Sequence, residues 1–263
     1  MTTTYIMSAN KSDFTTTYSP TIKLDPSKKY EAALLSLDMY NSIPNITKDN
    51  NIFTYSIDNG VTWKIIALDT GSYELAAINN EIQRLMVING DYNNNLFYIT
   101  ITANVSKLTS IVNITNPTYK VDFGVENSIG SVLGFEALII EAGYNESPNI
   151  VDIMKINSIL VNTDIIMGSY VNNFASPAIY SFYPNVSPGY KIVERPNPSL
   201  IFYPVARSDI RSIRVWLTDQ DSNPVDLRGE IVTVRICIRE VKSRSIRREI
   251  IAAYKDLKKQ NII

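Results

Sequence analysis

Residues 179–239 read IYSFYPNVSPGYKIVERPNPSLIFYPVARSDIRSIRVWLTDQDSNPVDLRGEIVTVRICIR, and this stretch decides the fold class. Prolines and an Asp/Asn-rich turn divide it into four or five short strands. Residues 212–217 and 230–239 alternate apolar and polar side chains, which predicts that they pair as a half-buried antiparallel hairpin. Nothing in the stretch resembles an active site, so we expect it to be the scaffold of a β-sandwich.

Short strands with turn signals about every ten residues also fill the rest of the chain, as is typical of sandwiches and barrels. Asp58, Asn59 and Gly60 form a strong hairpin signal between two of them. The segments predicted as strands are residues 21–24, 30–38, 52–57, 61–68, 96–103, 110–114, 156–166, 180–183, 190–194 and 200–203. The sequence therefore predicts a mainly β, antiparallel protein.

Three helices interrupt these strands. After Gly71, Ser72 is a candidate N-cap for a helix that ends near Asn89-Gly90. Its apolar face would carry Leu75, Ile78, Ile82, Leu85 and Met86. Residues 128–133 predict a short helical turn before Gly134. A last helix is expected over residues 243–259, so the chain divides into a β-sandwich over residues 1–240 and a helical arm over 241–263. An inserted or second small β subdomain remains open.

The composition excludes several kinds of chemistry. The 263 residues include no histidine and a single cysteine, Cys237. Ser-His-Asp and Cys-His nucleophiles, histidine general bases and the usual zinc ligand sets are therefore excluded, and no intramolecular disulfide can form. We expect Cys237 to be a passive thiol on a strand. We expect no cofactor and no enzymatic activity.

The two ends of the sequence indicate where in the cell the protein is made and how its charge is distributed. The first residues lack the basic start and apolar run of a secretory signal, and no stretch is long and apolar enough to predict a membrane span. We therefore expect a protein made inside a cell and not secreted. The net charge is −1, but residues 241–263 hold seven basic and two acidic residues and so carry +5.

This basic arm is the feature that suggests an interaction. Its basic residues near the start are Lys242, Arg244, Arg247 and Arg248, and its apolar stripe is Ile246, Ile250, Tyr254 and Leu257. An amphipathic helix of this kind can dock its stripe on its own domain or on a neighbouring subunit, or it can neutralise nucleic-acid phosphates. We favour docking and keep contact with DNA as the alternative.

Other candidate sites have simpler explanations. Asp219, Asp221, Asn223 and Glu230 have the spacing of a calcium loop, but Pro224 stands where that loop needs glycine, so a turn built on Asx side chains is the better interpretation. Glu126, Glu136, Glu141 and Asp152 could supply a carboxylate pair for glycoside hydrolysis, but nothing in the sequence places any two of them at a useful separation. The aromatic residues Tyr180, Phe182, Tyr183 and Tyr190 fit a sandwich core or subunit interface better than a sugar-binding surface.

The order of segments carries a family resemblance. YEAALLSLDMYNSIPNI at residues 30–46 is followed by the hairpin NNIFTYSIDNGVTWKIIAL, by GSYELAAINNEIQRLM, by VLGF at 132–135 and by INSILVNTDII at 156–166. SPGY, FYPV at 202–205 and VWLTDQDSNPVDLRGEIVTVRICIR complete the series. Over residues 28–240 this resembles the small capsid proteins of Polinton/Maverick elements, adintoviruses and virophage-like viruses.

The resemblance implies an antiparallel jelly-roll sandwich with inserted short helices and a C-terminal helix. At this length it implies a minor capsid, or penton, protein that closes the vertices of an icosahedral virion. Its partners would be itself, as a pentamer, and the major capsid protein, with contact between the basic arm and packaged DNA as a further expectation. The implied location is the virion capsid.

Three other functions stay open. They are a major-capsid-type jelly-roll subunit, a viral spike or lectin-like domain that recognises sugar or a host receptor, and a glycoside-active enzyme with two carboxylates in a cleft. The resemblance supplies no catalytic residue for the last of these.

Overall fold

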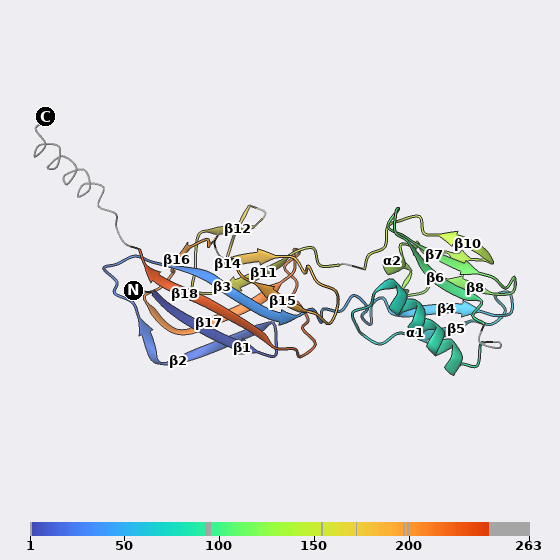
Figure 1. Ribbon diagram of the computed structural model, residues 1–263, viewed down its shortest axis with the longest axis horizontal. Coiled ribbons are helices and arrows are strands. Elements are labelled where there is room, and N and C mark those ends of the chain that lie inside the picture. The colour runs from blue at the N-terminus through green and yellow to red at the C-terminus, as the bar shows by residue number, and fades with distance from the viewer. Residues whose placement is uncertain are drawn as a thin grey trace, which may run out of the picture.

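The computed structural model describes residues 2–92, 96–153, 155–171, 173–196, 198 and 200–241. Figure 1 shows two bodies along one long axis, and most of the described elements are strands. The larger body is built from the two ends of the described chain, and the smaller one from its middle.

Two antiparallel sheets form the larger body. One has the order β1 (Thr2–Ala9), β18 (Val232–Glu240), β3 (Tyr30–Tyr40), β15 (Lys191–Glu194), with the short β16 (Tyr203–Pro204) also paired to β3. The other has the order β14 (Ala178–Phe182), β11 (Ile159–Thr163), β17 (Asp209–Thr218), β2 (Asp13–Lys23).

The pairing of these strands is nested. Leaving β16 aside, the first strand along the chain pairs with the last, β2 with β17, β3 with β15, and β11 with β14. A ribbon of four such pairs that wraps around a core is a jelly roll, and its remaining pairs, β18 with β3 and β11 with β17, complete the two sheets. The predicted fold class, mainly β with an antiparallel jelly-roll sandwich, is confirmed.

Alternation along the strands explains the core of the jelly roll. Leu37, Val234 and Ile236 point inward from one sheet, and Val215 and Leu217 point inward from the other. All belong to one buried hydrophobic cluster between the sheets. Because successive strand residues face opposite sides, each strand contributes every second residue to this core.

The smaller body lies between β3 and β11 in the chain and has a hydrophobic cluster of its own. Its elements are β4 (Ile52–Ser56), β5 (Lys64–Ala67), α1 (Leu75–Ile88), β6 (Ile99–Asn104), β7 (Thr109–Ile114), β8 (Lys120–Asp122), α2 (Gly130–Leu133), β9 (Ile139–Ile140) and β10 (Gly143–Glu146). They form the sheets β5-β4-β8-β9 and β10-β7-β6, and the buried face of α1 packs into the cluster. We propose that residues 44–153 are an inserted subdomain, called the insert below.

One predicted pairing is wrong. β17 and β18 do not form a hairpin, because β17 pairs with β11 and β2 whereas β18 pairs with β1 and β3. Both strands alternate because both cover the same core, from opposite sheets. Alternation shows which side of a strand is buried and does not identify the strand beside it.

Other boundaries also differ from the predictions. Ser72 is not the N-cap of α1: Glu74 occupies that position without a side-chain cap, and the Ser72 hydroxyl donates to the Ile43 carbonyl instead. β1 is a strand that the sequence interpretation omitted. Of the predicted strand at 156–166, only five residues form β11. Of that predicted at 200–203, only Tyr203 belongs to a strand, the short β16.

Several local predictions are confirmed. β4 and β5 pair across the Asp58–Gly60 turn, where Asn59 and Gly60 have φ of 62° and 89°. α1 ends at Ile88 with Asn89 as its C-cap, as the Asn-Gly signal predicts. The short helix α2 ends at Leu133, and its C-cap is Gly134, whose φ of 80° favours glycine. A Cβ at Gly134 would lie 2.3 Å from the Asn149 carbonyl oxygen, so a side chain has no room there.

Candidate functional site

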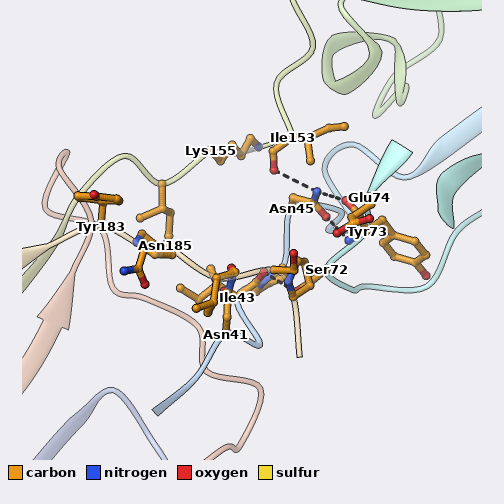
Figure 2. Close-up of a pocket in the computed structure, with 16 residues that line it drawn as sticks. Asn41, Ile43, Asn45, Ser72, Tyr73, Glu74, Ile153, Lys155, Tyr183 and Asn185 are labelled. Atoms are coloured by element: carbon orange, nitrogen blue, oxygen red, sulfur yellow. Dashed lines mark hydrogen bonds between the residues drawn. The ribbon is translucent and has the colours of Figure 1, made fainter. Parts of the chain in front are cut away.

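The chain crosses between the jelly roll and the insert twice, and both crossings meet at Asn45. The outgoing crossing follows β3, and the returning one precedes β11. The Asn45 side-chain amide donates to the Ile153 carbonyl at 3.1 Å and to the Tyr73 carbonyl at 2.7 Å (Figure 2). Its carbonyl oxygen accepts from the Tyr73 N–H at 2.8 Å. One buried amide thus ties the outgoing crossing to the returning one and to the start of α1.

A second asparagine holds the jelly-roll side of this junction. The Asn41 side chain donates to the Val186 carbonyl at 2.7 Å. Its backbone N–H donates to the Tyr190 carbonyl, and its carbonyl accepts from the Gly189 N–H. The loop between β14 and β15 is therefore fixed against the end of β3.

Between these two asparagines lies a cavity of about 520 Å³. Tyr73 and Tyr183 stand at opposite ends of the group of lining residues in Figure 2. The lining is mostly apolar and consists of Asn41, Ile43, Pro44, Asn45, Ser72, Tyr73, Glu74, Ile153, Lys155, Ile156, Tyr183, Pro184, Asn185, Val186, Ser187 and Pro188.

The side chains that line this junction pocket favour binding of a ligand over catalysis. Burial raises the pKa of Tyr73 above that of an ordinary tyrosine, and its hydroxyl donates to the Asp69 carbonyl at 3.0 Å. Glu74 and Lys155 supply one charge of each sign, and the remaining polar groups are amides and hydroxyls. The pocket is thus suited to an uncharged group with an apolar face, such as a sugar ring or a short peptide segment.

The acidic loop after β17 is closed by its own hydrogen bonds. One oxygen of Asp219 accepts from the Asp221 N–H at 2.9 Å and from the Asn223 N–H at 2.8 Å, and the other accepts from the Asn223 side chain at 3.1 Å. Glu230 lies beyond, in a turn where its N–H donates to Leu227. The geometry is that of Asx turns. Within the described ranges, no group of three acidic or cysteine side chains is placed to hold a metal ion.

The other predicted site residues have varied positions. The basic and apolar residues of the arm, from Lys242 to Leu257, lie outside the described residues. Tyr180 is half-buried, and its hydroxyl donates to Glu194 at 3.1 Å, whereas Tyr183 and Tyr190 are exposed. Glu126, Glu136, Glu141 and Asp152 are exposed in the insert, where Glu141 pairs with Lys120.

Sequence interpretation missed the junction pocket. Asn41, Asn45 and Tyr73 are far apart from Tyr183 in the chain, and asparagine is so frequent that none of these positions stands out. The available signal was that a strong strand, β3, is followed by a polar segment and a second set of strands before β11. A polar crossing of this kind marks an insertion.

Comparison with known proteins finds similarity among solved structures. No family model matches the chain, and no curated protein does. The structure is similar to the crystal structure of the mavirus penton protein, with a TM-score of 0.49 and 11% sequence identity over 91% of this chain and 99% of that one.

Two flagellar structures from Escherichia coli also align, weakly. The D2–D3 domains of the flagellar cap protein FliD give a TM-score of 0.14 at 12% identity, covering 91% of this chain and 100% of that one. The D1–D2–D3 domains of FliD give 0.14 at 11%, covering 92% of this chain and 56% of that one. Separately, none of the helices in the described part of the chain is both long and apolar enough to cross a membrane.

Proposed function

We propose that this chain is a structural capsid subunit that forms the vertices of an icosahedral virion. The observation that carries the proposal is the nested strand pairing of a complete jelly roll with a second body inserted between its third and fourth strands. The resemblance of residues 28–240 to small capsid proteins of Polinton-like elements and virophage-like viruses agrees with it.

The surface chemistry fits a protein that works by assembly. Large apolar side chains are exposed on both bodies, among them Tyr144, Tyr170, Phe174 and Tyr190. Exposed aromatic residues are enriched at subunit interfaces. We propose that the chain associates with itself, as a pentamer, and with the major capsid protein. We propose that it is located in the virion capsid and is made inside the host cell.

The arm after Val241 is proposed as a further contact. Its charge of +5 suits packaged DNA, and its apolar stripe suits a neighbouring subunit. No catalytic residue is part of the proposal.

The decisive experiment is an image of the native particle at a resolution that distinguishes folds. Density for this chain around the fivefold axes supports the proposal. Density in hexagonal capsomers supports the major-capsid alternative and contradicts the vertex role. In solution, sedimentation of the purified chain should show an oligomer, and a monomer at all concentrations and salts contradicts the proposal.

A second candidate, recognition of a glycan, is favoured by the junction pocket. Tyr183 is exposed and lines the same pocket as Asn41 and Asn185. Sugars are bound by this combination of ring stacking and amide hydrogen bonds. Binding of the purified chain to a glycan array, lost on Tyr183→Ala, would support this candidate; no binding would reject it.

A further inference from the structure

The jelly roll has two open sides, where its two sheets meet without backbone pairing. On the first, β1 and β2 are the edge strands, and Tyr5 packs edge to face on Tyr18 with 5.4 Å between ring centroids. On the second, β14 and β15 are the edges, and the Tyr180–Glu194 hydrogen bond joins them. Figure 1 shows β1 and β2 along the lower side of the jelly roll and β14 along the upper side. The two sides are thus opposite faces of one body.

The β14/β15 side is rich in exposed aromatic residues. A separate hairpin, β12 (Ser169–Val171) with β13 (Phe174–Ser176), precedes β14 and presents Tyr170 and Phe174 to solvent. Phe174 is 77% exposed. Tyr183 and Tyr190 follow at the other end, directly after β14 and directly before β15. Four large rings in water along one side are a costly arrangement unless a partner covers them.

The β1/β2 side is different in chemistry. β1 contains no charged residue, and its outward residues are Thr2, Thr4, Ile6 and Ser8, with Ile6 60% exposed. β1 pairs with β18 alone among the described strands, so its other edge presents unpaired backbone groups. Natural edge strands are usually protected by charges, prolines or bulges, and β1 has none of these. An unprotected edge of eight residues indicates a contact surface.

Charge argues that the partner on these sides is another copy of the chain, and that copies meet through the jelly roll. Residues 44–153 hold twelve acidic and five basic residues, a formal charge of −7. Residues 1–43 and 154–241 together hold thirteen basic and twelve acidic residues, a charge of +1. Two inserts in contact would repel, whereas two jelly rolls would not. Neither β1 nor β14 carries a charge, and their companion edge strands each carry one charge of either sign, Asp13 and Lys23 in β2 and Lys191 and Glu194 in β15, so the strands of each side have no net charge.

We propose that the β14/β15 side of one copy binds the β1/β2 side of the next. This inference rests on the proposed function, because a closed ring of identical subunits needs two different patches on opposite faces of each subunit. The aromatic rings of one copy then cover Ile6 and the threonines of its neighbour.

Two variants, one on each side, test the interface. Phe174→Asp and Ile6→Asp place a charge on the β14/β15 and β1/β2 sides, and Val61→Asp is the matched control, since Val61 is 81% exposed in the insert. Sedimentation velocity should show both interface variants as monomers at concentrations at least tenfold above those at which the unmodified chain and Val61→Asp associate. Unchanged circular dichroism and melting temperature of each variant confirm that the fold is intact.

Mixing the two variants distinguishes this interface from others. Each variant alone lacks one of the two patches in every copy, but an equimolar mixture contains one intact pair of patches. A 1:1 complex that grows no larger supports the inference. If only Phe174→Asp abolishes association, the contact joins two β14/β15 sides; if only Ile6→Asp does, it joins two β1/β2 sides. Either result overturns the inference.

The outcomes also separate the inference from the proposed function. If the unmodified chain associates and neither variant impairs this, the interface is wrong while the capsid role stands. If the unmodified chain never associates, the capsid role itself fails. Raising salt from 50 to 300 mM should strengthen association, because it screens repulsion between inserts. Weaker association at high salt would contradict a contact between sides whose strands carry no net charge.

Discussion

Replacing Asn45 by alanine should loosen the junction between the jelly roll and the insert. The substitution removes three hydrogen bonds, those to the Tyr73 N–H, the Tyr73 carbonyl and the Ile153 carbonyl. Each bond contributes about 0.5–1.5 kcal/mol net, and a buried group left without a partner costs more. Water in the adjacent cavity can satisfy part of what is lost. We therefore expect the free energy that holds the two crossings together to fall by about 2–3 kcal/mol.

The assay is limited proteolysis of the full chain, followed by urea unfolding. Cleavage should move to residues 41–45 and 153–156 and accelerate at least tenfold, because a local opening free energy that falls by about 1.4 kcal/mol raises the open population tenfold. Asn185→Ala is the control, since Asn185 lines the same pocket but is exposed.

A second substitution isolates the donor of this amide. Asn45→Asp keeps an acceptor for the Tyr73 N–H but places an oxygen against the two carbonyls of Tyr73 and Ile153. It should therefore destabilise the junction more than Asn45→Ala does. The assigned role would be refuted if Asn45→Ala were cleaved as slowly as the unmodified chain and its unfolding free energy lay within 1 kcal/mol of that chain's. A milder effect of Asn45→Asp than of Asn45→Ala would refute it as well.

Three further predictions concern single positions. Gly134→Ala should lower the unfolding free energy by more than 1 kcal/mol in urea titrations, because its Cβ would strike the Asn149 carbonyl and its φ is positive. Hydrogen bonds from Thr62 and Ser56 lower the pKa of Asp58 to about 2. The stabilising effect of this carboxylate is therefore complete above about pH 4 and lost as the pH falls through 2. In Asp58→Asn, the melting temperature should change less with pH between these two values. Burial raises the pKa of Cys237, so thiol reagents should label it at least a hundredfold more slowly in the native chain than in urea.

Strand composition and alternation were sufficient to predict the class of the fold. The inward residues of β17 and β18, such as Val215 and Val234, repeat every second position, and this pattern depends only on a buried side. The partner of each strand could not be predicted in the same way. β18 pairs with β1 and β3, more than 190 residues earlier in the chain, and such pairing is decided by the packing of the whole sandwich.

The junction pocket could not be predicted from local sequence patterns, for a related reason. Asn45 acts through a side-chain amide that reaches Tyr73 and Ile153, and no motif distinguishes this asparagine from the many others. By contrast, the Asx turn at Asp219 could be predicted, because its partners are two and four residues away. Interactions within a turn can be inferred from sequence, and those between distant loops need the fold.

The meeting of both crossings at Asn45 also has an evolutionary consequence. A body that is entered and left at one point can be lengthened, shortened or exchanged without changing the register of a single jelly-roll strand. Selection on the surface of the insert is then separated from selection on the strands that form the jelly-roll core. Relatives of this chain should accordingly differ most in length and sequence between β3 and β11, and least in the order of the strands on either side.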